Sequence, residues 1–125
     1  MKIRIKGDSV RIRLSKSEVD YFGQEGVYTS TTHFPNGSKF EYGLVVRHDL
    51  TQMDAEFSEK GIFLLVPQHW ADEWVATQRV GFDSKVSLAS GGELYLLLEK
   101  DFQCLDATTE DQTDMYPNPL AEQHK

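Results

Sequence analysis

Basic side chains are concentrated at the start of the sequence. Five of them alternate with aliphatic residues within the first thirteen positions, namely Lys2, Arg4, Lys6, Arg11 and Arg13. Guanidinium and ammonium groups bind phosphate and carboxylate through charge-assisted hydrogen bonds, so the residue types predict an anion-binding surface. Lys39 and Arg47 are candidate extensions of that surface. The pattern leaves open a second interpretation, a solvated sheet face whose charges are relieved by water, salt and the protein's own acids.

The chain as a whole is acidic, with a formal net charge of −7 at pH 7 over 125 residues. Residues 1–48 carry eight basic and five acidic side chains, whereas residues 49–125 carry five and fifteen. A negative field repels nucleic-acid backbones at long range, which disfavours nonspecific nucleic-acid binding. We therefore expect the basic cluster to act at short range, on a small anion or an acidic protein partner.

Other residues with chemical potential give weaker signals. The potential metal ligands near the C-terminus are Cys104, Asp106, Glu110, Asp111, Asp114 and His124. Their spacing matches neither a calcium loop nor a paired-cysteine zinc site. His33, His48 and His69 fall on separate expected elements, and the sequence has no nucleophile elbow, phosphate loop or zinc-protease motif. We therefore predict no metal, no cofactor and no catalytic residue, and a binding module in preference to an enzyme.

The elements of the first half follow from hydrophobic periodicity. Alternation on both sides of residues 7–9 predicts a β-hairpin with one apolar and one basic face. Ser15 and Glu18 have the spacing of a capping box, which begins a helix that Gly26 ends. Strands at 27–34 and 39–48 follow, joined through an Asn-Gly turn.

The same order recurs in the second half. Strands are expected at 54–57, 61–66, 80–88 and 93–102, with a helix from Pro67 to about residue 77. Trp70 and Trp74 are four residues apart on that helix and are expected to pack into the core. A shift of 52 residues superposes the apolar pattern of one half on the other. We predict an α+β, mainly β fold: a duplicated ββαββ unit forming an antiparallel, barrel-like sheet of about eight strands with two short helices.

The domain organisation follows from this pattern. Residues 1–102 are expected to form one domain of two pseudo-repeats, 1–50 and 51–102, and residues 103–125 an acidic tail that packs on it. A single cysteine excludes an internal disulfide. No stretch approaches the roughly 20 apolar residues of a membrane span and the start has no secretory core, so we expect a cytoplasmic protein with no membrane contact.

The first hairpin resembles a known DNA-binding element. Residues 7–16, Gly-Asp-Ser-Val-Arg-Ile-Arg-Leu-Ser-Lys, are similar to the N-terminal hairpin of AbrB- and MazE-like regulators. In that family two chains interleave and the hairpin arginines contact DNA. The resemblance implies, as an alternative function, an antitoxin-like DNA-binding regulator that uses Arg4, Arg11 and Arg13.

Two further resemblances concern the whole chain. The first hairpin, the Lys-Asp-Phe-x-Cys-Leu segment at 100–105 and the Glu-Asp-Gln-x-Asp-x-Tyr-Pro-Asn-Pro segment at 110–119 are similar to a family of small bacterial proteins of unknown function. The expected architecture is similar to the triphosphate-tunnel (CYTH) barrels, which implies a phosphohydrolase as another alternative. The Glu-x-Glu-x-Lys signature of the first strand in those barrels is missing from this sequence.

Overall fold

The structure, a computed structural model, describes residues 1–102 as eight strands and two helices in the predicted order. The elements are β1 Lys2–Ile5, β2 Ser9–Leu14, α1 Lys16–Glu25, β3 Val27–His33, β4 Lys39–Arg47, β5 Asp54–Phe57, β6 Gly61–Pro67, α2 Gln68–Ala76, β7 Gly81–Ser87 and β8 Glu93–Lys100. Neither of these helices is long and apolar enough to cross a membrane. The expected packing of residues 103–125, and the potential metal ligands among them, lie outside the described residues.

The strands form two four-stranded sheets. Sheet A has the order β1-β2-β8-β7 and sheet B the order β3-β4-β6-β5. Each sheet joins a hairpin from the first half of the chain to a hairpin from the second half, and the two strands at the junction are parallel. The prediction of one antiparallel, barrel-like sheet is therefore wrong, because the strands divide between two open sheets and the central pair of each sheet is parallel.

The strands at the parallel junctions have a sequence pattern that differs from the alternation of polar and apolar residues. The central strands β6 and β8 contain uninterrupted apolar runs at residues 62–66 and 94–98, as is common for strands with neighbours on both sides. Such a run predicts a central strand but does not name its partner. The junction between β2 and β8 brings together residues such as Arg11 and Glu99, which are 88 positions apart in the chain.

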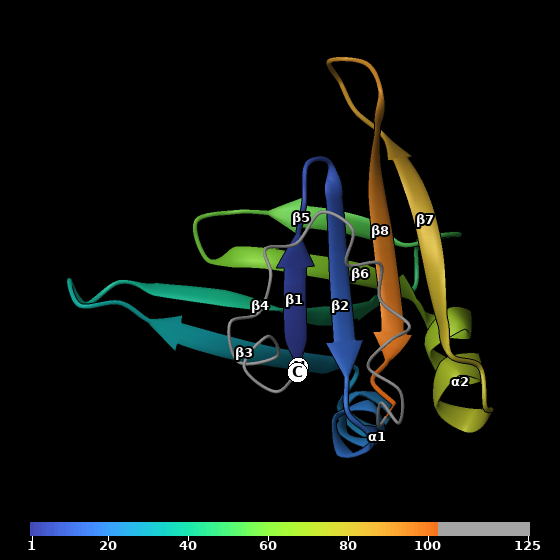
Figure 1. The fold of residues 1–125 in the computed structure, drawn as a ribbon. Coiled ribbons are helices and arrows are strands. Elements are labelled where there is room, and N and C mark those ends of the chain that lie inside the picture. The colour runs from blue at the N-terminus through green and yellow to red at the C-terminus, as the bar shows by residue number, and fades with distance from the viewer. Residues whose placement is uncertain (103–125) are drawn as a thin grey trace, which may run out of the picture.

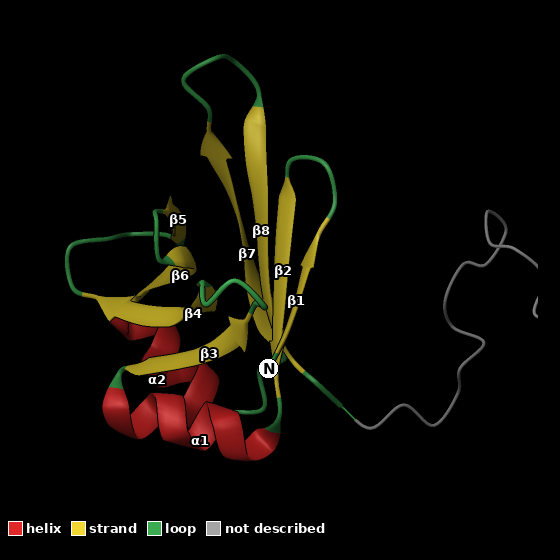
Figure 2. Ribbon diagram, turned by 90° about the vertical axis from the view of Figure 1, so that its left-hand side faces the viewer, coloured by secondary structure: helices red, strands yellow, loops and turns green. Residues whose placement is uncertain are grey.

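The sheets and helices enclose one core. Sheet A stands upright in Figure 1, and the strands of sheet B run across behind it. The two helices lie together at one end of both sheets, as Figures 1 and 2 show from two sides. They pack against each other at Gly23, where an added Cβ atom would come within 2.7 Å of Val75 Cγ1. A larger side chain at Gly23 would push the helices apart.

The core is apolar and aromatic. Phe22 from α1 and Trp74 from α2 are fully buried, and their rings meet edge to face with centroids 6.2 Å apart. Trp70 stacks on Phe82 with ring centroids 4.9 Å apart. Its side chain is partly buried and packs against the core. The prediction that both tryptophans serve core packing is confirmed. The other buried apolar residues of the core are Val10, Ile12, Leu14, Val19, Leu44, Met53, Leu64, Val66, Ala71, Phe82, Leu96 and Leu98.

Helix α1 begins and ends at the predicted residues. The backbone N–H of Ser15 donates to Glu18 Oε1 at 2.8 Å, and the N–H of Gly26 donates to the Phe22 carbonyl oxygen at 2.8 Å. The other carboxylate oxygen of Glu18 accepts hydrogen bonds from the N-terminal ammonium of Met1 and from the Tyr28 hydroxyl. Glu18 therefore ties the first residue and strand β3 to the start of the helix.

Candidate functional site: the basic face of sheet A

The predicted basic residues of the first hairpin share the outer face of sheet A, turned away from sheet B. Lys2 lies opposite Arg13, and Arg4 lies opposite Arg11, across the β1–β2 pair. The alternate residues of β2 point inward and are buried in the core. Lys6 follows β1 in the hairpin turn. We call the surface formed by Lys2, Arg4, Lys6, Arg11 and Arg13 the basic face; Figure 1 views sheet A from this side.

Two acids from β8 and its end neutralise part of the basic face. Glu99 Oε1 accepts hydrogen bonds from Arg11 Nε at 2.7 Å and Arg13 Nε at 3.4 Å, so one carboxylate serves two guanidinium groups. Asp101 pairs with Lys2 at 3.0 Å. Within residues 1–102, Arg4 and Lys6 take part in no ion pair. The ion pairs of the basic face therefore lie toward the end of β2 and not toward the hairpin turn.

Two shallow concavities lie on the basic face. The larger, about 200 Å³, is lined by three of its cations, Arg4, Lys6 and Arg11, and no acid lines it. Tyr95 forms part of its wall, and its hydroxyl donates to Asp83 at 3.2 Å. Burial and the neighbouring Asp83 carboxylate raise the pKa of Tyr95, so its phenol stays protonated as a donor at neutral pH. The smaller concavity, about 130 Å³, is lined by Lys2, Ile3 and Arg4 of β1 and by the two arginines of β2. Both are lined by guanidinium groups, whose planar donors match the geometry of carboxylate and phosphate groups.

The two other predicted site residues lie on sheet B. Lys39 is the first residue of β4 and Arg47 is the last, so they are at opposite ends of one strand. Arg47 forms a two-pronged pair with Asp49, with Nε and Nη2 donating at 3.0 and 2.8 Å. The structure therefore brings together the five hairpin cations, and it places Lys39 and Arg47 apart from them.

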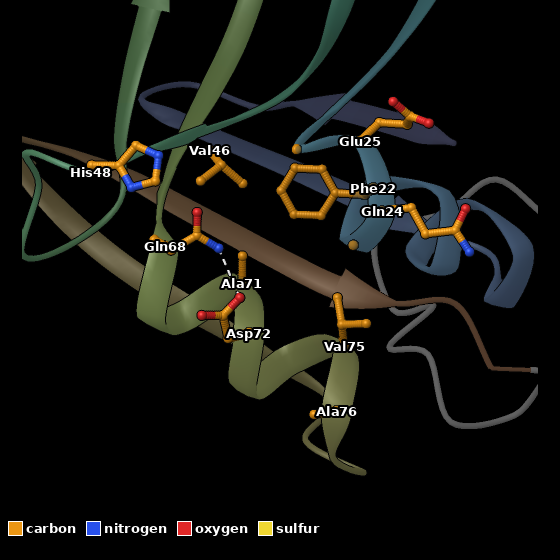
Figure 3. A pocket seen from close by; sticks show the side chains of 12 residues that line it. Phe22, Gln24, Glu25, Val46, His48, Gln68, Ala71, Asp72, Val75 and Ala76 are labelled. Atoms are coloured by element: carbon orange, nitrogen blue, oxygen red, sulfur yellow. Dashed lines mark hydrogen bonds between the residues drawn. The ribbon is translucent and has the colours of Figure 1, made fainter.

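A cleft between the helices is a feature that the sequence reasoning missed. It has a volume of about 620 Å³, an apolar floor that includes Phe22, Val46 and Val75, and a polar rim (Figure 3). Gln68 on the rim donates to Asp72 at 2.8 Å. A second cleft of about 610 Å³ lies at the start of α1 and the end of β8, and Val75 lines both. The small residue at the helix crossing, Gly23, is the sequence signal that could have indicated them.

The titratable residues of the described chain do not gather into a metal site. Among residues 1–102, no group of three or more histidine, cysteine, aspartate or glutamate side chains is close enough to hold a metal ion. His33 ends β3, His48 follows β4 and lines the first interhelical cleft, and His69 lies on α2. The chemistry that this arrangement supports best is electrostatic binding at the basic face.

Neutralising the shared carboxylate should destabilise the protein in a salt-dependent manner. In Glu99→Gln, Arg11 and Arg13 lose their common acceptor. Each of them still faces another cation across the hairpin, and like charges opposite one another destabilise a sheet. We expect the free energy of unfolding to fall by about 1–2 kcal/mol in low salt, with most of the loss recovered near about 1 M NaCl. Urea unfolding followed by tryptophan fluorescence at both salt concentrations measures this difference.

The matched control for Glu99→Gln is Glu73→Gln. Glu73 on α2 pairs at 3.3 Å with Arg79, which follows the helix, and both side chains are about half exposed (49%). This pair should contribute little, because exposed ion pairs are screened by water and salt. An equal loss in both variants, or a loss at Glu99 that salt leaves unchanged, contradicts the role assigned to Glu99.

Fold and site together define a class: an α+β protein with two mixed four-stranded sheets, two helices across one end, and a cationic outer face on one sheet. Within that class, the model of the "Family of unknown function (DUF7009)" matches residues 1–120, and the chain belongs to this family. The whole-chain resemblance to a family of unknown function is thereby confirmed. No curated protein matches the chain, and no solved structure matches it.

Proposed function

We propose that this protein is a binding module whose basic face recognises an anionic ligand or an acidic protein partner. The observation that carries the proposal is a comparison of the two sheets. A shift of 52 residues relates β1–β2 to β5–β6 with the same cross-strand register. The positions equivalent to Lys2, Arg4, Arg11 and Arg13 are occupied by Asp54, Glu56, Phe63 and Leu65.

This difference separates the cations from the requirements of the fold. Sheet B has the same strand arrangement as sheet A, but its equivalent hairpin, β5–β6, carries acids and apolar residues at the four matching positions. Exchanging the two halves of the chain converts the strand order of one sheet into that of the other, which supports our proposal that the halves arose by duplication. If the halves are copies, only the first copy carries cations at these four hairpin positions. The second copy forms the same hairpin without them, so the fold does not require them.

The arrangement of the cations also has a cost that a ligand would offset. Arg4 opposes Arg11 directly, and Lys2 opposes Arg13, and such like-charge pairs destabilise a sheet. Glu99 and Asp101 reduce the charge repulsion at the end of the hairpin nearest the helices. The concavity among Arg4, Lys6 and Arg11 offers a bound carboxylate or phosphate several donors at once.

The two alternative functions receive less support from the described residues. A phosphohydrolase of the tunnel type needs charged groups inside the barrel, whereas the space between these two sheets is filled with apolar side chains. A DNA-binding regulator would use the same basic face, so it remains an outcome of the binding experiments. The hairpin that it would use pairs with β8 of its own chain.

The proposal predicts that a short fluorescent polyglutamate peptide binds the protein through the hairpin. Fluorescence anisotropy should show affinity that falls between about 50 mM and about 200 mM salt, because the contacts are ionic. The double variant Arg4→Gln, Arg11→Gln should lose at least about tenfold in affinity, equivalent to about 1.4 kcal/mol. These two side chains line the larger concavity together.

The matched control removes the same charge from sheet B. Lys39→Gln combined with Arg47→Gln neutralises the two predicted cations that lie away from the hairpin. Its affinity for the peptide should change by less than about twofold if contact, not net charge, decides binding. Equal losses in the two double variants would refute the proposed site.

A further inference from the structure

The described chain ends beside the basic face. The backbone N–H of Asp101 donates to the Leu14 carbonyl oxygen at 2.8 Å, which holds the end of β8 against the end of β2. The side chain of Asp101 pairs with Lys2 at 3.0 Å. The first acid after β8 thus already neutralises one residue of the basic face, and the chain continues from that point.

The segment that follows has the opposite charge. Residues 103–125 contain five aspartate or glutamate residues and one lysine. Three of the acids, Glu110, Asp111 and Asp114, fall within five positions. The basic face offers five cations, of which Arg4 and Lys6 have no ion pair in the part of the chain that the structure describes. Charge complementarity therefore connects this segment with this face.

The reach of the segment is sufficient. An extended chain covers about 3.3 Å per residue, so the acids at 110–114 can lie up to roughly 25–40 Å from Phe102. Strand β2 has six residues, which correspond to about 20 Å. Every cation of the basic face is consequently accessible to these acids. Because the segment is covalently attached, its effective concentration at the face is on the order of millimolar.

We propose that the acidic segment 103–125 is an intramolecular ligand of the basic face, and that the external partner is an acidic polypeptide segment that competes with it. This inference rests on the function proposed above, because it assigns both ligands to the same cations. The segment thereby sets the charge density that an external partner needs in order to bind. A weakly acidic partner fails to displace the segment, whereas a partner with a denser run of carboxylates succeeds. Its own chemistry, carboxylates carried on a polypeptide, indicates the class of the competitor.

The test compares two full-length variants with the same change in net charge. The tail variant carries Glu110→Gln, Asp111→Asn and Asp114→Asn. The control variant carries Glu25→Gln, Glu56→Gln and Glu59→Gln, three exposed acids on α1, β5 and the turn after β5. The tail variant should bind the fluorescent polyglutamate peptide about tenfold more tightly than the unaltered protein, because the competitor is removed. The control should bind as the unaltered protein does.

The outcomes separate the two proposals. Equal affinity in the tail variant and the control overturns the intramolecular ligand and leaves the basic face as the binding site. Absence of peptide binding in every variant overturns the proposed function. A DNA duplex that gains more affinity than the peptide in the tail variant overturns the assignment to an acidic polypeptide and favours nucleic acid.

A second measurement tests proximity without any external ligand. Cys104→Ser removes the single native cysteine, and Gln112→Cys then allows one nitroxide label among the tail acids. The label should broaden the amide NMR signals of β1 and β2 much more than those of β5, and neutralising the three acids should restore them. Equal broadening in both sheets, or broadening that persists after neutralisation, overturns the inference.

Discussion

Gly61→Ala should destabilise the protein strongly. Gly61 begins β6 with φ +149°, in a region that favours glycine, and lies opposite Glu41 of β4. An added Cβ atom would come within 1.7 Å of the Glu41 carbonyl oxygen, so the central strands of sheet B would have to separate. We expect a loss of about 4 kcal/mol and a decrease in Tm on the order of 20 °C. Thermal unfolding followed by circular dichroism measures it.

The control for this variant is Gly37→Ala. Gly37 also has a positive φ, +88°, but an added Cβ atom meets nothing within 4 Å. Only the backbone preference is lost there, at a cost of about 1–2 kcal/mol. The difference between the two variants isolates the steric contact between β6 and β4. If both substitutions cost the same, the close approach of the two strands does not contribute to stability.

The sequence predicts the local elements because their signals are local. The hairpin around residues 7–9, the capping box at Ser15 and Glu18, and the helix end at Gly26 all depend on neighbours within a few positions. The sheet junctions depend on contacts such as that between Arg11 and Glu99, for which no short-range pattern exists. The four hairpins were therefore predicted correctly, but their assembly into one antiparallel barrel was not.

The candidate site shows the same division. Alternation in β1 and β2 predicted one basic face, and the structure places it on the outside of sheet A. The shared acceptor Glu99 and the separation of Lys39 from the hairpin follow from pairing between distant strands, so the sequence did not indicate them. The interhelical clefts depend on how α1 and α2 cross at Gly23, which amphipathic periodicity does not specify.

Glu18 should make the stability of the protein depend on pH in the acidic range. Burial raises the pKa of Glu18, but hydrogen bonds from the N-terminal ammonium, the Ser15 N–H and the Tyr28 hydroxyl outweigh it and hold the pKa at about 2, against an ordinary value of 4.5. The folded state thus binds this proton less readily than the unfolded state. Its contribution is complete above pH 4.5 and is lost as pH falls toward 2.

The size of the pKa shift of Glu18 determines how much stability Glu18→Gln should lose. The variant should lose about 2–3 kcal/mol of unfolding free energy at neutral pH, and its stability should fall less steeply than that of the unaltered protein below pH 4.5. Urea unfolding across this range measures both quantities. Glu25→Gln is the control, because Glu25 is exposed at the opposite end of α1, away from the groups that hydrogen-bond to Glu18. It should leave the acid-range slope unchanged, and the same change of slope in both variants would assign the effect to general charge repulsion in the unfolded chain instead of the contacts of Glu18.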